Sequence, residues 1–179
     1  YNDDEALELP NSYIIGSGKE LEIPVAKAYA VWKNNADLKA TNPTLEGKVT
    51  AELIWMDTEG LVSNANSLTV EGEGVNAIIK LNTASGKNGN ALIGVKIGDY
   101  VSSPEEISIR WSWHVWVTDE EVYAKTYQLN GYTFMDRDLG ALNATAGNVK
   151  TIGLHYQWGR KDPFKGYADF VGTAGTIYN

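Results

Sequence analysis

Few side chains in this sequence could carry nucleophilic or metal chemistry. The only imidazoles are those of His114 and His155, and the chain has no cysteine. The two histidines lack the HExxH spacing that brings two imidazoles to one zinc ion, and thiolate ligands are absent. Residues 16–18, Gly-Ser-Gly, lack the outer spacing of a nucleophile elbow. We therefore expect no enzyme, no cofactor and no metal, although a Ser/His/Asp arrangement assembled at long range stays open.

Carboxylates are the other candidates for chemistry, because a pair of them about 5 to 9.5 Å apart can hydrolyse a glycosidic bond. The densest candidate among the 23 acidic residues is Asp136-Arg137-Asp138. An arginine between two aspartates usually indicates local ion pairing. Residues 119–121, Asp-Glu-Glu, do not have the ligand spacing of a calcium loop. A carbohydrate-active enzyme is therefore an alternative to the leading hypothesis below.

Aromatic side chains are the better candidates for binding. In residues 107–117, "ISIRWSWHVWV", alternation places Trp111 and Trp113 on one face with the aliphatic residues, as in the core of a β-sheet. Arg110, His114 and Trp116 share the opposite face. We predict this face as a recognition surface; alternatively, a second module covers it and Trp116 packs against that module.

A second aromatic cluster lies near the C-terminus. Tyr156 and Trp158 fall in a stretch rich in glycine and aromatic residues, and sugar-binding proteins often present such rings to solvent. We predict these two residues as a second ligand-binding cluster. The alternative is that they pack the interior of the C-terminal module.

The positions of these residues depend on strands that alternate with period two. The expected inward sets are Val49, Ala51, Leu53 and Trp55; Val75, Ala77, Ile79 and Leu81; and Ala91, Ile93, Val95 and Ile97. Turn-rich stretches with Gly, Asn, Asp and Ser separate these runs. Short strands with such turns predict an all-β protein with an immunoglobulin-like antiparallel β-sandwich. Residues 25–39 fit a helix and a strand equally well.

The same pattern suggests a division of the chain. We expect an acidic N-terminal tail over 1–10, the sandwich domain over 11–118, a linker over 119–130, and a partial second module, rich in aromatic residues and glycine, over 131–179. This second module is expected to be β-rich.

Overall charge limits the partners. The chain has 15 basic and 23 acidic residues, a net charge of −8, and no basic run longer than Arg160-Lys161. Nucleic acids and anionic membranes attract concentrated positive charge, so we expect neither as a partner. The longest apolar stretches are far shorter than the ~20 residues of a membrane span. The sequence gives no indication of an oligomeric state.

Residues 134–164, "FMDRDLGALNATAGNVKTIGLHYQWGRKDPF", resemble a motif in surface and secreted proteins of gut Bacteroidales, of the fimbrillin-like and cell-adhesion type. The stretch is also similar to the major paralogous domain repeated in Fibrobacter proteins. Upstream, "NSYII" at 11–15 and "WSWHVWVTDE" at 111–120 look like elements that precede this motif in such proteins.

The resemblance implies an extracellular, outer-membrane-anchored protein of the bacterial cell surface, with a lipid anchor upstream of this fragment. The implied role is non-enzymatic adhesion, with a glycan or an extracellular matrix protein as the ligand. A pilin or fimbrial assembly subunit is the first alternative, since it would share the sandwich. No catalytic residue set is implied by the resemblance.

Overall fold

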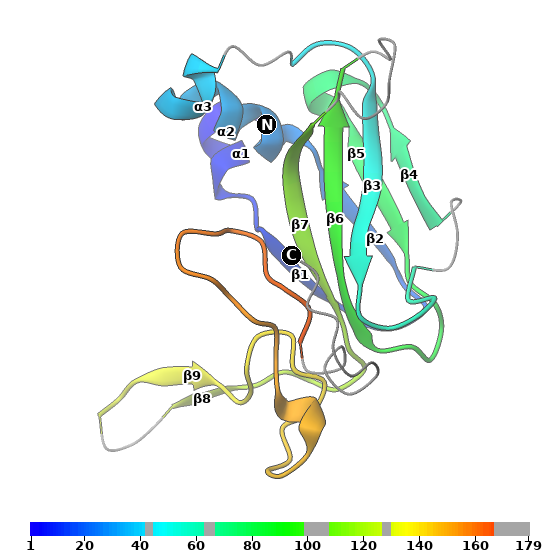
Figure 1. Cartoon of the computed structure of the whole chain (residues 1–179), viewed down its shortest axis with the longest axis vertical. Coiled ribbons are helices and arrows are strands. Elements are labelled where there is room, and N and C mark those ends of the chain that lie inside the picture. The colour runs from blue at the N-terminus through cyan, green and yellow to red at the C-terminus, as the bar shows by residue number, and fades with distance from the viewer. Residues whose placement is uncertain (42–44, 63–66, 99–107, 127–129, 167–179) are drawn as a thin grey trace, which may run out of the picture.

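The computed structural model describes residues 1–41, 45–62, 67–98, 108–126 and 130–166, and is predominantly β. Two sheets face each other across one hydrophobic core (Figure 1). The larger sheet has the order β1-β7-β6-β3 and the smaller one β2-β5-β4. Their strands are β1 (Ser12–Ile15), β2 (Glu20–Pro24), β3 (Val49–Met56), β4 (Leu68–Glu71), β5 (Ile78–Asn82), β6 (Gly89–Ile97) and β7 (Ile109–Val117). All neighbouring strands within these two sheets are antiparallel except β1, which runs parallel to β7.

The alternation of apolar residues explains most of this core. All four predicted inward residues of β6 are buried between the sheets, as are Ile79 and Leu81 of β5. Trp113, Val115 and Val117 of β7 join them, and Trp111 packs against the same cluster while half-buried. Val75 is an exception, because it lies in a 3₁₀ turn, η2 (Gly74–Asn76), and is exposed.

Trp55 is on the opposite face of the sheet from the one predicted. The register of β3 against β6 shifts between Leu53 and Trp55, so Ile54 is an extra residue in the strand. Such a bulge reverses the alternation that follows it. Met56 therefore packs against the core in place of Trp55, and Trp55 pairs with Leu92 on the outer face.

Residues 25–39, which the sequence left open, form helices α2 (Ala26–Asn34) and α3 (Ala36–Ala40). Small residues make this possible, because Ala26, Ala28 and Ala30 let the helix approach its neighbours closely and are all buried. Asn35 ends α2 and begins α3, where its side chain accepts a hydrogen bond from Leu38 N at 3.0 Å.

The segment 1–10, which we expected to be an acidic N-terminal tail, contains a short helix. Residues Asp3–Glu8 form α1, which begins with a reciprocal capping box between Asn2 and Glu5. Ala6 packs against α2, and Lys27 Nζ donates to the carbonyl oxygens of Leu7 and Leu9. A helix this short has too few turns for a periodic signal and depends on packing for its stability.

The remaining described residues form a C-terminal module with little regular structure. A hairpin of β8 (Ala124–Thr126) and β9 (Thr133–Met135) projects from one end of the sandwich, whereas α1 to α3 lie at the other end (Figure 1). The hairpin begins inside the segment 119–130 that we predicted as a linker. Residues 136–166 contain one 3₁₀ turn, η4 (Val149–Thr151), and contact the outer face of the larger sheet.

Candidate functional site

A buried polar network connects the C-terminal module to the larger sheet. Asn90 Nδ2 donates to Asp57 Oδ2 at 2.8 Å and to the carbonyl oxygen of Gly140 at 2.9 Å. Because both amide hydrogens are used, Asn90 Oδ1 is the acceptor for His114 Nε2, 2.9 Å away. His114 is thus a neutral imidazole protonated on Nε2, and its Nδ1 has no hydrogen-bond partner in the described structure. Burial lowers the pKa of His114 to about 4.

A second set of contacts holds the module on β7. Ser112 Oγ donates to Asp162 Oδ1 at 2.5 Å, and Lys161 Nζ donates to the carbonyl oxygen of Ser112 at 2.8 Å. The same ammonium group lies 4.7 Å from the ring centroid of Trp111, where the negative face of the indole attracts a cation. These contacts cover the polar face of the strand.

The recognition surface that we predicted on this face is therefore covered. His114 is 3% exposed and Trp116 0% exposed, so an outside ligand cannot reach them. Arg110 is half-buried, with its guanidinium 5.0 Å from the ring centroid of Trp32 in α2, and it donates to Ser108 Oγ at 3.0 Å. The alternative, that the second module packs over this face, fits the observed contacts.

The acidic residues near the hairpin form an ion-pair cluster. Arg137 donates from Nε and Nη2 to the two carboxylate oxygens of Asp136 and from Nη1 to Glu120, each at 2.9 Å, with a further bond to the carbonyl oxygen of Glu121. Hydrogen bonding from Arg137 lowers the pKa of Asp136. Asp136 therefore stays ionised and is poorly suited to donate a proton as the acid of a glycosidase. The predicted local ion pairing is confirmed.

Residues 155–164, named the Trp158 loop from this point on, form the most exposed aromatic feature of the described chain. Backbone hydrogen bonds between His155 and Phe164, at 3.2 and 2.8 Å, close the base of the loop. At the tip, Arg160 N donates to Gln157 O at 3.1 Å, and Gly159 adopts a φ of 78° that closes the turn. Trp158 stands at this tip and is fully exposed (102%).

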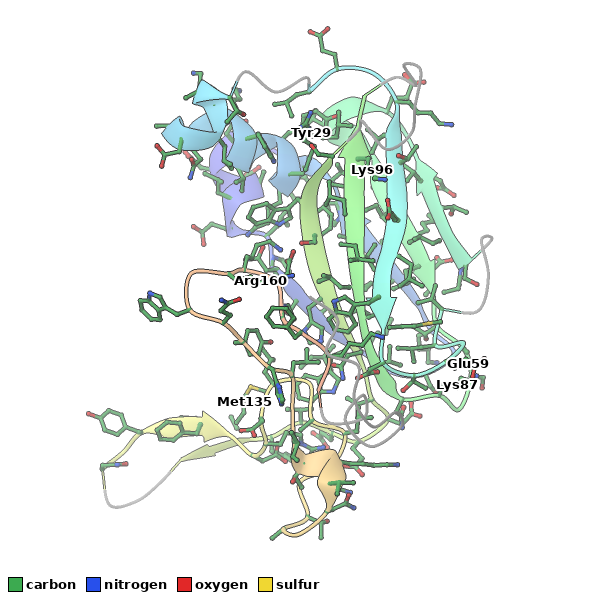
Figure 2. The ribbon with its side chains drawn as sticks, in the orientation of Figure 1. Tyr29, Glu59, Lys87, Lys96, Met135 and Arg160 are labelled. Atoms are coloured by element: carbon green, nitrogen blue, oxygen red, sulfur yellow. The ribbon has the colours of Figure 1, made fainter. Side chains whose placement is uncertain are left out.

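Two further side chains of the Trp158 loop face outward. Tyr156 is 51% exposed, and partial burial raises the pKa of its hydroxyl to about 12, so the phenol stays protonated at neutral pH. Arg160 places its guanidinium 4.2 Å from the ring centroid of Phe164. Figure 2 shows Arg160 on this loop, which runs out from the body of the module. The structure thus leaves Tyr156 and Trp158, the second predicted cluster, accessible to a ligand.

A separate exposed aromatic pair, which we did not predict from the sequence, lies on the β8–β9 hairpin. Tyr132 and Phe134 are both exposed and stack edge to face, with ring centroids 6.4 Å apart. Met135 and Tyr123 are exposed at the base of the same hairpin. Tyr132 immediately precedes β9 and Phe134 lies within it, and this two-residue spacing was a signal that could have identified the pair.

A cavity of about 290 Å³ lies at the junction of the module and the sandwich. Asp57 and Asn90 supply polar groups from the sandwich, and the module supplies mainly aliphatic walls, from Leu142, Val149, Ile152 and Leu154. Gly140, which also lines the cavity, has a φ of 83° and leaves no room for a Cβ. Close packing thus limits substitution on this side of the junction.

Within the described ranges, no group of three or more His, Cys, Asp or Glu residues is arranged to hold a metal ion. The same ranges contain no helix that is long and apolar enough to cross a membrane. Comparison of the chain with protein-family models, with curated proteins and with solved structures found no match.

Proposed function

We propose that this chain is a non-enzymatic extracellular binding protein that contacts a glycan through the Trp158 loop. One observation carries the proposal, namely a fully exposed tryptophan at the tip of a loop whose base is fixed by hydrogen bonds. Exposing an indole forfeits the free energy of burying it, roughly several kcal/mol by area. A ligand that covers the ring recovers that free energy.

The surroundings of the ring support a sugar more than a protein surface. Protein interfaces bury an anchor residue inside a wide apolar patch. The neighbours of Trp158 at the tip are Gln157, Gly159 and Arg160, which are polar or small and also exposed. A pyranose needs only one ring face for its C–H groups and hydrogen-bonding partners for its hydroxyls. The phenol of Tyr156 and the amide of Gln157 are of the required kind.

The family resemblance of residues 134–164 supports a bacterial cell-surface location for this glycan-binding function. An adhesin needs its binding loop to project away from the anchored part of the protein. Accessibility of the loop to protease added to intact cells of the native host would test the location. Protection of the loop on intact cells, with cleavage only after lysis, would contradict it.

We also propose that the sandwich is immunoglobulin-like. In such domains the second, fifth and fourth strands form one sheet and the third, sixth and seventh form the other. The orders β2-β5-β4 and β7-β6-β3 correspond to these groups. The first strand departs from the constant-type arrangement, since β1 pairs with β7. Cross-strand amide contacts measured by NMR would test both pairings.

A glycan array with the purified protein and a Trp158→Ala variant tests the binding function. We expect the variant to lose binding, while Tyr132→Ala, which truncates another exposed ring, on the hairpin, retains it. Equal loss in both variants, or loss in Tyr132→Ala alone, would place binding outside the Trp158 loop. Binding to a matrix protein that persists after its glycans are removed would identify a protein ligand instead.

The second candidate function is an assembly subunit, which the edge position of β1 favours. This strand has only four residues, and β7 is its one neighbour among the strands of the described residues. Removing it would leave the edge of β7 open to a strand from another copy. Proteolytic trimming through Gly18 should then produce concentration-dependent polymers on size-exclusion chromatography. A folded product that stays monomeric would argue against assembly.

A further inference from the structure

Positive charge is concentrated around the Trp158 loop although the chain as a whole is acidic. Residues 155–166 contain three basic residues, Arg160, Lys161 and Lys165, and one acidic residue, Asp162. Their net charge is +2, so the rest of the chain, with 12 basic and 22 acidic residues, carries −10. An acidic protein repels anions in general, and a local reversal of sign at an exposed tip gives an anionic ligand one favourable point of approach.

Arg160 differs from the other two arginines of the chain in its partners. Arg137 is fully occupied by Asp136, Glu120 and a backbone carbonyl. Arg110 is half-buried and lies over Trp32. Within the part of the chain that the structure describes, no carboxylate pairs with Arg160, whose guanidinium rests on the ring of Phe164. Stacking holds the guanidinium plane in place and leaves its N–H edge for a ligand.

The neighbouring lysine cannot take the same role. Lys161 Nζ is bound by Ser112 and Asp162, and these contacts hold the module on β7. A ligand can therefore bind Arg160 without breaking the contacts that hold the Trp158 loop on β7. Its planar fork of N–H donors matches the two oxygens of a carboxylate.

We propose that the Trp158 loop recognises an anionic glycan that carries uronic acid, with one pyranose ring against Trp158 and a sugar carboxylate bound by Arg160. This inference rests on the proposed glycan-binding function and adds the chemical class of the ligand. Trp158 supplies contact with any pyranose, whereas Arg160 supplies the preference for the acid. The two residues should therefore be separable by mutation.

Matched ligands test the proposal. Oligogalacturonate and hyaluronan oligosaccharides, each with its methyl ester, differ in the charge of the carboxyl group while the sugar rings stay the same. We expect at least one acid to bind about tenfold more tightly than its ester, since a charged hydrogen bond at an exposed site contributes about this factor. The preference should weaken as salt is raised from 50 to 500 mM.

Variants then assign the preference to a residue. Arg160→Gln should reduce the affinity for the acid to that for the ester and leave the affinity for the ester unchanged. Arg160→Lys, which keeps the charge but loses the planar fork, should retain only part of the preference. Trp158→Ala should weaken binding of acid and ester alike. Thermal unfolding of each variant, matched to that of the wild type, confirms that the fold is intact.

The outcomes distinguish the two levels of the proposal. If acid and ester bind equally, or if Arg160→Gln keeps the full preference for the acid, the assignment of an anionic glycan is wrong. The binding function would still stand in that case, provided that Trp158→Ala abolishes binding. If the wild-type protein binds neither these ligands nor any neutral glycan on the array, both the function and the ligand class are overturned.

Discussion

Replacing Asn90 with alanine should weaken the contact between the C-terminal module and the larger sheet and so destabilise the protein. The Asn90 side chain is buried and bonds to His114, to Asp57 and to the carbonyl oxygen of Gly140. The substitution leaves three polar groups without that partner. Each buried polar group left without a hydrogen bond costs about 1 to 3 kcal/mol. The cost for Asp57 is at the lower end, because this carboxylate is partly accessible to solvent. We expect a loss of about 3 to 5 kcal/mol in the free energy of unfolding, a large part of the stability of an ordinary domain.

Urea denaturation followed by tryptophan fluorescence measures this loss. Asn34→Ala is the matched control, because its side chain is exposed and bonds only within the N-terminal helical region, so it should cost less than about 1 kcal/mol. Asn90→Leu distinguishes hydrogen bonding from packing, since leucine fills a similar volume but leaves the same groups unpaired. A cost below about 1 kcal/mol for Asn90→Ala, or full rescue by leucine, would refute the reasoning.

Three further perturbations address the same junction and the N-terminal helix. Gly140→Ala should destabilise the protein by about 2 to 4 kcal/mol, because its φ is 83° and a Cβ there would lie 2.6 Å from Leu154 Cγ. The control Gly147→Ala has a similar φ of 80° but open space around it, and should cost only about 1 kcal/mol in the same urea assay. Burial lowers the pKa of His114 from 6.5 to about 4, so protonation of this residue costs no stability above pH 6.5. As the pH falls from 6.5 to 4, the unfolded chain takes up a proton before the folded one does, and the free energy of unfolding decreases by about 3 kcal/mol. His114→Gln should flatten the stability profile over that range, and an unchanged slope would contradict the assignment. Lys27→Met should release α1, because the ammonium group that binds its last carbonyls is gone, and limited proteolysis should then cleave within the first ten residues faster than in the wild type.

Local patterns in the sequence were sufficient to predict much of the sandwich. Alternation assigned every inward residue of β6 correctly and separated Trp113 from His114 across β7. It was wrong for Trp55, because a bulge changes the phase of a strand without leaving a clear mark in the composition. Alternation did not predict α1, because this helix is stabilised by Ala6 packing on α2, which is distant in the sequence.

One predicted binding cluster is covered and the other is exposed, and the reason is also tertiary. The sequence placed Arg110, His114 and Trp116 on one face of a strand. His114 and Trp116 are paired in register with Leu92 and Asn90 of β6, whereas the register of β7 shifts at Arg110. Periodicity states which residues share a face but cannot state what covers the face. The cover comes from segments distant in the sequence. Gly140, Lys161 and Asp162 bond to Asn90 and Ser112, and Trp32 of α2 lies against Arg110.

Sequence patterns were enough to predict the predominantly β character of the chain, the inner face of most strands and the aromatic content of the two candidate clusters. Each of these properties depends on residue type and on spacing over a few positions. Contacts between distant segments, and not these patterns, bury Trp116 of β7 and leave Trp158 of the C-terminal loop exposed. Exposure depends on which distant segments meet, and local residue order carries little record of those contacts.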